Sequence, residues 1–253
     1  MPIYLVCRLS SFFALLLLSF SVCSETVLVA VASNFSKPMT EIAAGFAKAT
    51  GHEAKLAFGS SGKFVAQIEN GAPFEVLLSA DEKGPSKLVQ AHLAEADSRF
   101  VYALGRLVLW SATANFVDAE GKVLSSGQFK HLALADPKLA PYGMAAMEVL
   151  QKLGLLAKLQ PLFVQGENIA QTLQFISTGN AELGFVAYSQ VLENGKISQG
   201  SVWLVPSESY TPIRQSAVLL KKGAKNPAAA ALLAYLQTPE ALAVIKQYGY
   251  DLP

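Results

Sequence analysis

The sequence predicts a two-lobed α/β protein. Short apolar runs typical of strands alternate along the chain with segments of helical period, a pattern that favours sheets covered by helices. The length of 253 residues is large for one average domain. Two long apolar runs, at 101–110 and 213–220, are expected to cross between the lobes. Because strand–helix units repeat, we expect a parallel or mixed sheet with helices on both faces in each lobe.

In the first half of the chain, helices are predicted where apolar residues recur every three or four positions and a glycine follows. This pattern occurs from Ser36 to Gly51 and again from Phe64 to Gly71. Asp81 is expected to begin a further turn or helix. Strands are predicted at 26–31, 56–58, 74–79 and 101–110.

In the second half, Asn226 and Thr238 each precede a proline, as N-caps often do. Strands are predicted at 131–135, 162–164, 183–186, 201–205 and 213–220. Helices are predicted at 144–153 and 169–178 and after the two N-caps, with 141–143 as a turn. We assign 25–104 to the first lobe, 105–212 to the second, and 213–253 to a return into the first.

Residues 1–24 have the features of a secretory signal peptide. Arg8 is their only charge, an apolar core follows, and small or polar residues precede Glu25. The core is too short for a convincing membrane span. We expect cleavage after Ser24; the alternatives are a retained N-terminal anchor and a lipoprotein modified at Cys23, where the preceding Val22 fits poorly.

Cleavage removes Cys7, Cys23 and Arg8, so the mature chain has no thiol and is formally neutral. Thiol catalysis, cysteine-bound zinc and iron–sulfur clusters are therefore excluded. The whole chain has 20 Lys and Arg against 19 Asp and Glu without a basic stripe, so nucleic acid is not an expected partner. With 52% hydrophobic and 15% charged residues, the chain is not intrinsically disordered.

Four strand-to-helix junctions have the composition of an anion site. They are the segments 32–35, 58–62, 141–143 and 166–169, rich in Ser, Asn and Gly. Each serine or asparagine alone is more simply explained as a helix cap. If several junctions face one cleft, their backbone N–H groups and helix dipoles converge on a bound anion.

Catalytic interpretations have less support. Three histidines are available: His52 and His92 at helix ends, and His131, which could be partly buried at the start of a strand. The Gly59–Gly62 segment lacks the spacing of a nucleophile elbow, although a secreted serine hydrolase using Ser60 or Ser61 stays an alternative.

Four tyrosines are conceivable ferric-ion ligands, although ordinary amphipathic positions at element ends explain them equally well. They are Tyr188, Tyr210, Tyr248 and Tyr250.

A series of motifs runs through residues 26–251 in a fixed order. They are VASNF (31–35), FGSSG (58–62), QIENGAPF (67–74), LSAD (78–81), ADPKLAPYG (135–143), LGFVA (183–187) and YGY (248–250). The series resembles the family of periplasmic molybdate-binding proteins (ModA) of ABC importers. The resemblance implies a type II periplasmic-binding-protein fold, each lobe a mixed sheet flanked by helices, with the ligand cleft between the lobes. It also implies no catalytic activity and no cofactor.

The resemblance further implies that a tetrahedral oxyanion, molybdate or tungstate, is held only by hydrogen-bond donors, with no direct bond from protein to metal. Ser33 and Ser61 are expected to donate through their hydroxyl and backbone N–H groups. Tyr142 and Ile169 are expected to donate backbone N–H groups from the opposite lobe.

Three further positions are considered as ligands. Asn34 follows Ser33 and is a second candidate there. Some family members add a tyrosine hydroxyl at the position of Ala187, whereas the tyrosine of this chain stands one residue later, at Tyr188. Because a shift of one residue redirects a side chain, we do not carry the tyrosine role over to Tyr188.

The resemblance implies a monomer in the periplasm that delivers its ion to the membrane permease of an ABC transporter. Donor-only ligands suit fully deprotonated molybdate, tungstate or sulfate, whereas the proton of hydrogen phosphate would lack an acceptor. A sulfate-binding or other oxyanion-binding protein of the same fold is therefore the nearest alternative.

Overall fold

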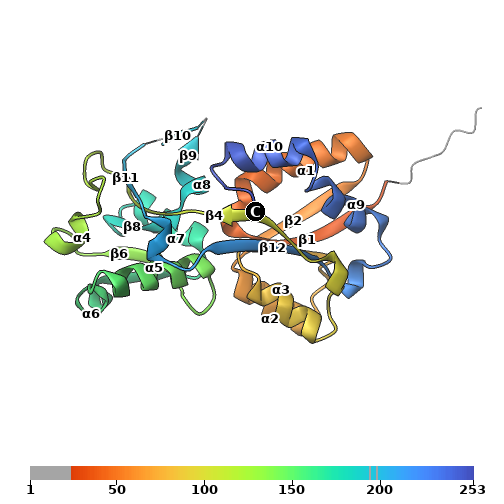
Figure 1. Cartoon of the computed structure of the whole chain (residues 1–253), viewed down its shortest axis with the longest axis horizontal. Helices are drawn as coiled ribbons and strands as arrows, with labels where there is room; N and C mark the ends of the chain where they lie inside the picture. Colours follow the sequence, from red (N-terminus) through yellow and green to blue (C-terminus); the bar gives the residue numbers. More distant parts are fainter. Residues whose placement is uncertain (1–23, 194, 198) are drawn as a thin grey trace, which may run out of the picture.

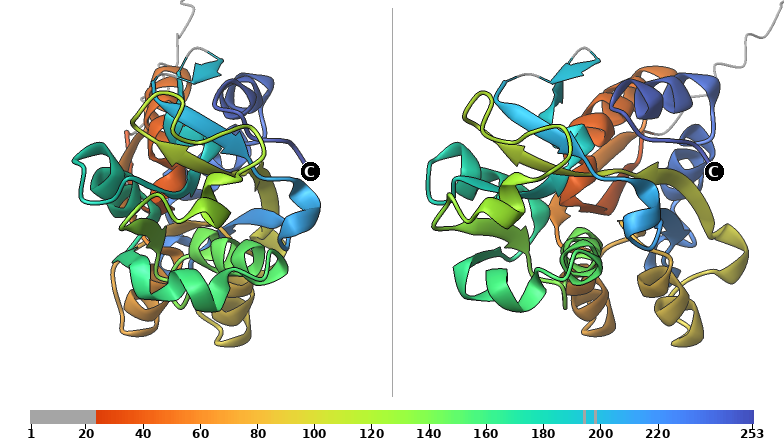
Figure 2. Two further views of the ribbon diagram at one scale, coloured as in Figure 1. Left: turned by 90° about the vertical axis from the view of Figure 1, so that its left-hand side faces the viewer. Right: turned by 60° about the vertical axis from the view of Figure 1, so that its left-hand side comes forward.

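The computed structural model describes residues 24–193, 195–197 and 199–253, and the expected signal peptide therefore lies outside the described residues except for Ser24. Two five-stranded mixed sheets lie side by side along the length of the molecule, each flanked by helices (Figures 1 and 2). This arrangement confirms the predicted two-lobed α/β fold.

The first sheet has the strand order β2-β1-β3-β12-β4. Its strands are β1 (Thr26–Ala32), β2 (Glu53–Gly59), β3 (Val76–Ser79), β4 (Phe100–Gly105) and β12 (Ile213–Leu219). Strands β1, β2 and β3 are parallel, and β12 is antiparallel to both neighbours. The carboxyl ends of the three parallel strands therefore share one edge of the sheet.

Helices cover both faces of this sheet because β1 alternates its side chains between two cores. Val27, Val29 and Val31 pack against α1, α9 and α10, whereas Ala30 packs with α2 and α3 on the other face. Figure 1 shows the two groups of helices on opposite sides. The helices are α1 (Ser36–Thr50), α2 (Ser61–Glu69), α3 (Lys83–Gln90), α9 (Pro227–Tyr235) and α10 (Pro239–Gln247).

The second sheet has the order β11-β5-β8-β6-β7. Its strands are β5 (Leu107–Ser111), β6 (Leu132–Ala135), β7 (Phe163–Gly166), β8 (Leu183–Ala187) and β11 (Ser201–Leu204). Its helices are α4 (Val123–Ser126), α5 (Pro141–Lys152), α6 (Leu156–Leu159), α7 (Ile169–Ser177) and α8 (Tyr188–Val191), and β9 (Leu192–Glu193) pairs with β10 (Lys196–Ile197). Strand β6 is parallel to β7 and β8, so their carboxyl ends also share an edge.

The long apolar runs do not cross between lobes as single strands. The run at 101–110 is interrupted at Arg106: Gly105 still pairs with Ile213 in the first sheet, and Leu107 pairs with Ala187 in the second. The run at 213–220 forms β12, which lies wholly in the first sheet, and the return crossing precedes it. Apolar residues on both sides of Arg106 hide this interruption from the hydrophobic pattern.

Most helix limits follow the predicted caps. The side chains of Asn226 and Thr238 accept hydrogen bonds from the first turns of α9 and α10, as expected. The predicted turn at 141–143 is instead the first turn of α5, with Pro141 at a position where proline suits a helix. His131, for which partial burial was one option, is exposed.

Among the described residues, no single helix is long and apolar enough to cross a membrane. Only α9 and α10 taken together pass that length and composition test, and they are bent by 61° where they meet.

Candidate functional site

A small cavity lies where the carboxyl ends of parallel strands from both sheets meet. Its volume is about 10 Å³. All four strand-to-helix junctions identified in the sequence contribute to it. Its lining consists of Ala32, Ser33, Asn34, Gly59, Ser60, Ser61, Ala80, Ala140, Pro141, Tyr142, Asn168 and Ile169. The structure therefore brings Ser33, Ser61, Tyr142 and Ile169 together around one space, with Asn34 beside them.

The first lobe supplies two buried serines whose positions are fixed by the ends of β1 and β2. Ser33 and Ser61 are 4% and 2% exposed. The Ser61 hydroxyl oxygen accepts a hydrogen bond from the backbone N–H of Ala80 at 2.9 Å, which leaves its hydrogen able to donate. Because Ser61 is the first residue of α2, no carbonyl of that helix accepts its backbone N–H. Ser61 thus offers two donors at the helix N-terminus.

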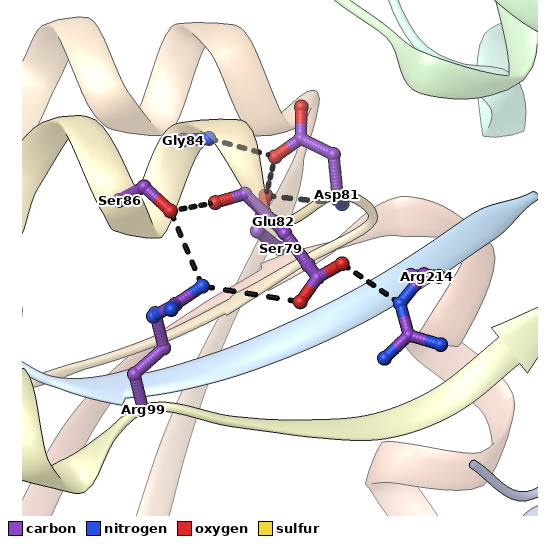
Figure 3. Close-up of polar contacts among 7 residues, drawn as sticks. All are labelled: Ser79, Asp81, Glu82, Gly84, Ser86, Arg99 and Arg214. Carbon is purple, nitrogen blue, oxygen red and sulfur yellow. Dashed lines mark hydrogen bonds and ion pairs between the residues drawn. The ribbon is translucent and has the colours of Figure 1, made fainter.

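Ala80 belongs to the turn after β3, and Figure 3 shows the polar contacts of the residues on either side of it. The Asp81 carboxylate accepts hydrogen bonds from the Ser79 hydroxyl and the Gly84 backbone N–H, both at 2.9 Å. Next to it, the Glu82 carboxylate lies 2.8 Å from Arg214 Nε and 3.9 Å from Arg99 (Figure 3). These charged groups pair with one another outside the cavity.

The second lobe presents two helix N-termini to the cavity. Tyr142 stands in the first turn of α5, and Ile169 is the first residue of α7. Their backbone N–H groups have no acceptor within their own helices, so they suit an external acceptor. Asn168 caps α7, because its Oδ1 accepts from the N–H groups of Ala170 (2.9 Å) and Gln171 (3.1 Å).

Direct contacts join the two lobes around the cavity. The Gly62 N–H donates to the Leu139 carbonyl at 2.9 Å. A Cβ on Gly62 would lie 3.0 Å from the same oxygen, so glycine permits this approach. The ammonium group of Lys63 forms an ion pair with Glu167. With these contacts made, the cleft between the two lobes is closed.

The side chain of Asn34 belongs to a buried polar network. Its Nδ2 donates to Gln215 Oε1 (2.8 Å) and to the Tyr250 hydroxyl (2.9 Å), and it makes no helix cap. Gln215 Nε2 in turn donates to the Tyr142 hydroxyl at 3.4 Å. The network therefore links a cavity residue of the first lobe with one of the second.

The buried phenols of this network stay protonated. Burial raises the pKa of Tyr250 to about 12 and also raises the pKa of Tyr142 and of Tyr102 above the usual value. Neutral phenols can both donate and accept hydrogen bonds, which suits their places in this network.

The other tyrosines considered as ferric ligands have separate partners. Tyr210 accepts from the Leu107 N–H, and Tyr248 donates to Glu41. Within the described residues, no three His, Cys, Asp or Glu side chains gather into a metal cluster.

Ala187 and Tyr188 do not line the cavity. Ala187 is fully buried, and its N–H donates to Gln190 Oε1 at 2.9 Å. The ring of Tyr188 lies beneath the Arg106 guanidinium, 5.3 Å from the ring centroid. Ala187 ends β8 and Tyr188 begins α8. The cavity instead lies beyond the ends of β6, which pairs with β8, and of β7 on the far side of β6.

The cavity is lined by uncharged residues. Among its described lining residues there is no Lys, Arg, His, Cys, Asp or Glu, and the donors are hydroxyls and backbone N–H groups. Ser60, Ala80, Ala140 and Asn168 also line it but were not expected as ligands. Asn168 could have been found from the sequence, because an asparagine just before a helix predicts a cap. Ala80 and Ala140 have no side-chain feature that marks them as cavity residues.

Comparison with known proteins agrees with this geometry. Residues 27–251 match the family described as bacterial extracellular solute-binding proteins. The chain is 56% identical over 226 residues to the molybdate-binding protein ModA of Azotobacter vinelandii, which covers 89% of this chain and 90% of that protein. The chain belongs to the ModA family of bacterial extracellular solute-binding proteins. The family resemblance stated from the motifs is thereby confirmed.

Two further ModA comparisons support the same assignment. The molybdate-binding protein ModA of Rhodobacter capsulatus is 54% identical over 224 residues, 88% of this chain and 87% of that protein. The solved structure of the Azotobacter vinelandii periplasmic molybdate-binding protein superposes with a TM-score of 0.87 at 44% identity, covering 90% of this chain and 99% of that one. The expected type II fold is confirmed.

Proposed function

We propose that this protein captures molybdate, and tungstate equally well, in the interlobe cavity and delivers the ion to the membrane permease of an ABC importer. The observation that carries the proposal is the cavity itself, a closed space lined by uncharged donors from both lobes. Several preorganised dipoles can stabilise a dianion without a cationic side chain when water is excluded. The family relatives, which are named for molybdate binding, agree with it.

The proposed ligand groups are the hydroxyl and N–H of Ser33 and of Ser61, and the backbone N–H groups of Tyr142 and Ile169. All four residues are at least 96% buried and line the same cavity. Asn34 also lines the cavity beside Ser33. Its side-chain amide already donates to Gln215 and Tyr250, so it is not counted among these ligand groups. Ala187 and Tyr188 lie outside the lining and are left out of the proposed set.

Size and protonation define the ligand class. A cavity of about 10 Å³ is far smaller than the roughly 300–1,000 Å³ usual for drug-sized organic ligands, which favours a small ion. Hydrogen phosphate would bring a proton to a lining without a carboxylate, and an unpaired buried polar group costs about 1–3 kcal/mol. We therefore expect phosphate to bind roughly 10- to 100-fold more weakly than an unprotonated dianion of matching size.

We further propose that the protein acts as a periplasmic monomer and has no catalytic activity. The ModA relatives are named as binding proteins, and the described cavity lining offers no histidine or carboxylate to activate Ser60 or Ser61. If an ester were hydrolysed and the Ser61→Ala variant lost that turnover, the hydrolase alternative would replace this proposal.

Calorimetric titration of the purified protein with molybdate, tungstate, sulfate and phosphate, at one pH and salt concentration, tests the proposal. Tight one-to-one binding of molybdate and tungstate, with sulfate and phosphate far weaker, is the expected result. Preference for sulfate would favour the alternative of a sulfate-binding protein. Absence of binding to all four would refute oxyanion capture.

A further inference from the structure

The hydroxyl group of Ser60 has no structural task in the described chain. Ser60 stands at the N-cap of α2 with extended backbone angles (φ −80°, ψ 144°). At this position a serine oxygen usually accepts a hydrogen bond from an N–H of the first turn. Here it makes no such cap, and the Gly62 N–H donates instead to the Leu139 carbonyl of the opposite lobe.

This hydroxyl is also buried. Ser60 is 3% exposed, and its Oγ has no hydrogen-bond partner in the described residues. Buried polar groups are almost always paired, so an unpaired one needs an explanation. Ser216 is the other buried hydroxyl in this condition within the described residues.

The position of Ser60 supplies the explanation. Ser60 lines the cavity together with Ser33 and Ser61, whereas Ser216 lies in β12 and does not. A hydroxyl rotates freely and donates to whichever acceptor is present. A tetrahedral oxyanion offers acceptors in every direction, and it would meet Ser60 at the same helix N-terminus that holds Ser61.

We propose that the Ser60 hydroxyl is a further donor to the bound oxyanion, a role that rests on the proposed function of this cavity. The site would then contain three serine hydroxyls, two of them consecutive at the start of α2. The Ser60 hydroxyl would find a hydrogen-bond partner only when the ion is present. Ser60 would thus contribute to affinity without stabilising the ligand-free fold.

Two variants of Ser60 test the assignment. Ser60→Ala and Ser60→Gly both remove the hydroxyl, and glycine is well tolerated at an N-cap. We expect both to raise the calorimetric Kd for molybdate by roughly 10- to 100-fold, the usual loss for a hydrogen bond to a charged group. The thermal unfolding temperature of the ligand-free protein should not fall in the alanine variant, because no existing hydrogen bond is lost.

The matched control is Ser216→Ala, which removes a buried, unpartnered hydroxyl outside the cavity. Its Kd for molybdate should stay within about twofold of the parent. The assignment is overturned if both Ser60 variants keep the parental Kd, or if Ser216→Ala weakens binding as much as they do. If the parent protein itself binds no molybdate, the proposed function fails first and the role of Ser60 fails with it.

Discussion

The side-chain oxygen of Asn168 lies 3.3 Å from the hydroxyl oxygen of Ser33, across the boundary between the two lobes. The same Asn168 oxygen accepts the N–H groups of Ala170 and Gln171 and so caps α7. If Ser33 turns its hydrogen toward a bound ion, Asn168 Oδ1 keeps two donors. Exchanging this interlobe hydrogen bond for a ligand contact therefore leaves no buried acceptor unpaired.

From this relationship we predict that Asn168→Asp keeps the cap of α7 but weakens the binding of molybdate. Aspartate caps helices as well as asparagine does, so the ligand-free stability should change little. The new carboxylate would stand beside a dianion, and at about 6 Å and an effective dielectric near 20 their repulsion is on the order of several kcal/mol. Calorimetry should show molybdate affinity reduced more than about 100-fold.

The companion variant Asn168→Ala should instead lose the cap of α7 and keep more of the affinity for molybdate. It removes the cap and should lower the free energy of unfolding by about 1 kcal/mol. It introduces no charge, so its affinity for molybdate should exceed that of Asn168→Asp. Binding by Asn168→Asp within about fivefold of the parent would contradict the placement of this residue at the ion.

A second prediction concerns Ser61. Ser61→Ala removes a ligand donor and also leaves the buried Ala80 N–H without its acceptor. We expect molybdate affinity to fall roughly 10- to 100-fold and the free energy of unfolding to fall by about 1–3 kcal/mol. Urea denaturation of the ligand-free protein measures the second effect. Ser61 would thus differ from Ser60, whose loss should affect binding alone; parental affinity in Ser61→Ala would refute its ligand role.

Much of this architecture was predictable because local patterns determine it. The helical period and terminal glycine of 36–51 give α1, and its C-cap Gly51 adopts the left-handed conformation (φ 74°) that glycine permits. The strand-to-helix junctions that contain Ser33 and Ser61 were also recognisable locally, whereas the choice of these two serines as ligands came from the family resemblance. The limits of α1 and the positions of these junctions each depend on residues close together in the sequence.

Other features depend on residues far apart in the chain. Asn34 looks like a ligand or cap, yet its direction is set by Gln215 and Tyr250, which are 181 and 216 positions later. The interruption at Arg106 is invisible locally, since strands of two different sheets meet there with apolar residues on both sides. Ala80 lines the cavity and donates its backbone N–H to Ser61, and no side-chain pattern marks such a role.

A third prediction concerns the ion pair between Lys63 and Glu167, which joins α2 to the segment before α7 across the cleft. Both side chains are about half exposed, at 44% and 50%, and exposed pairs contribute about 0–1 kcal/mol. Lys63→Gln should therefore weaken molybdate binding less than about fivefold at low salt. The difference from the parent should vanish near 1 M salt, where charges are screened within about 3 Å.

Lys122→Gln is the matched control for that titration. Lys122 also forms an exposed ion pair, with Glu120, and its removal changes the net charge equally. Molybdate affinity of this variant should follow the parent at every salt concentration. If the loss of molybdate affinity in Lys63→Gln stays the same in high salt, Lys63 contacts the ligand directly and does not act through its ion pair with Glu167.

The last prediction follows from the buried hydroxyl of Tyr250, which donates to the Asn34 carbonyl at 2.8 Å and lies 2.9 Å from the Ser189 hydroxyl. Burial raises its pKa to about 12 from the usual 10, so the unfolded chain releases this proton first as the pH rises.

Stability that is complete below pH 10 should therefore decline between pH 10 and 12, by about 3 kcal/mol for this group. The raised pKa values of Tyr142 and Tyr102 act in the same direction. Tyr250→Phe should be less stable near pH 8, because the hydrogen bonds of its hydroxyl with Asn34 and Ser189 are lost, but should lose less free energy of unfolding between pH 9 and 11.5. Urea denaturation at several pH values measures both, and equal alkaline losses in parent and variant would show that Tyr250 is not the group that titrates.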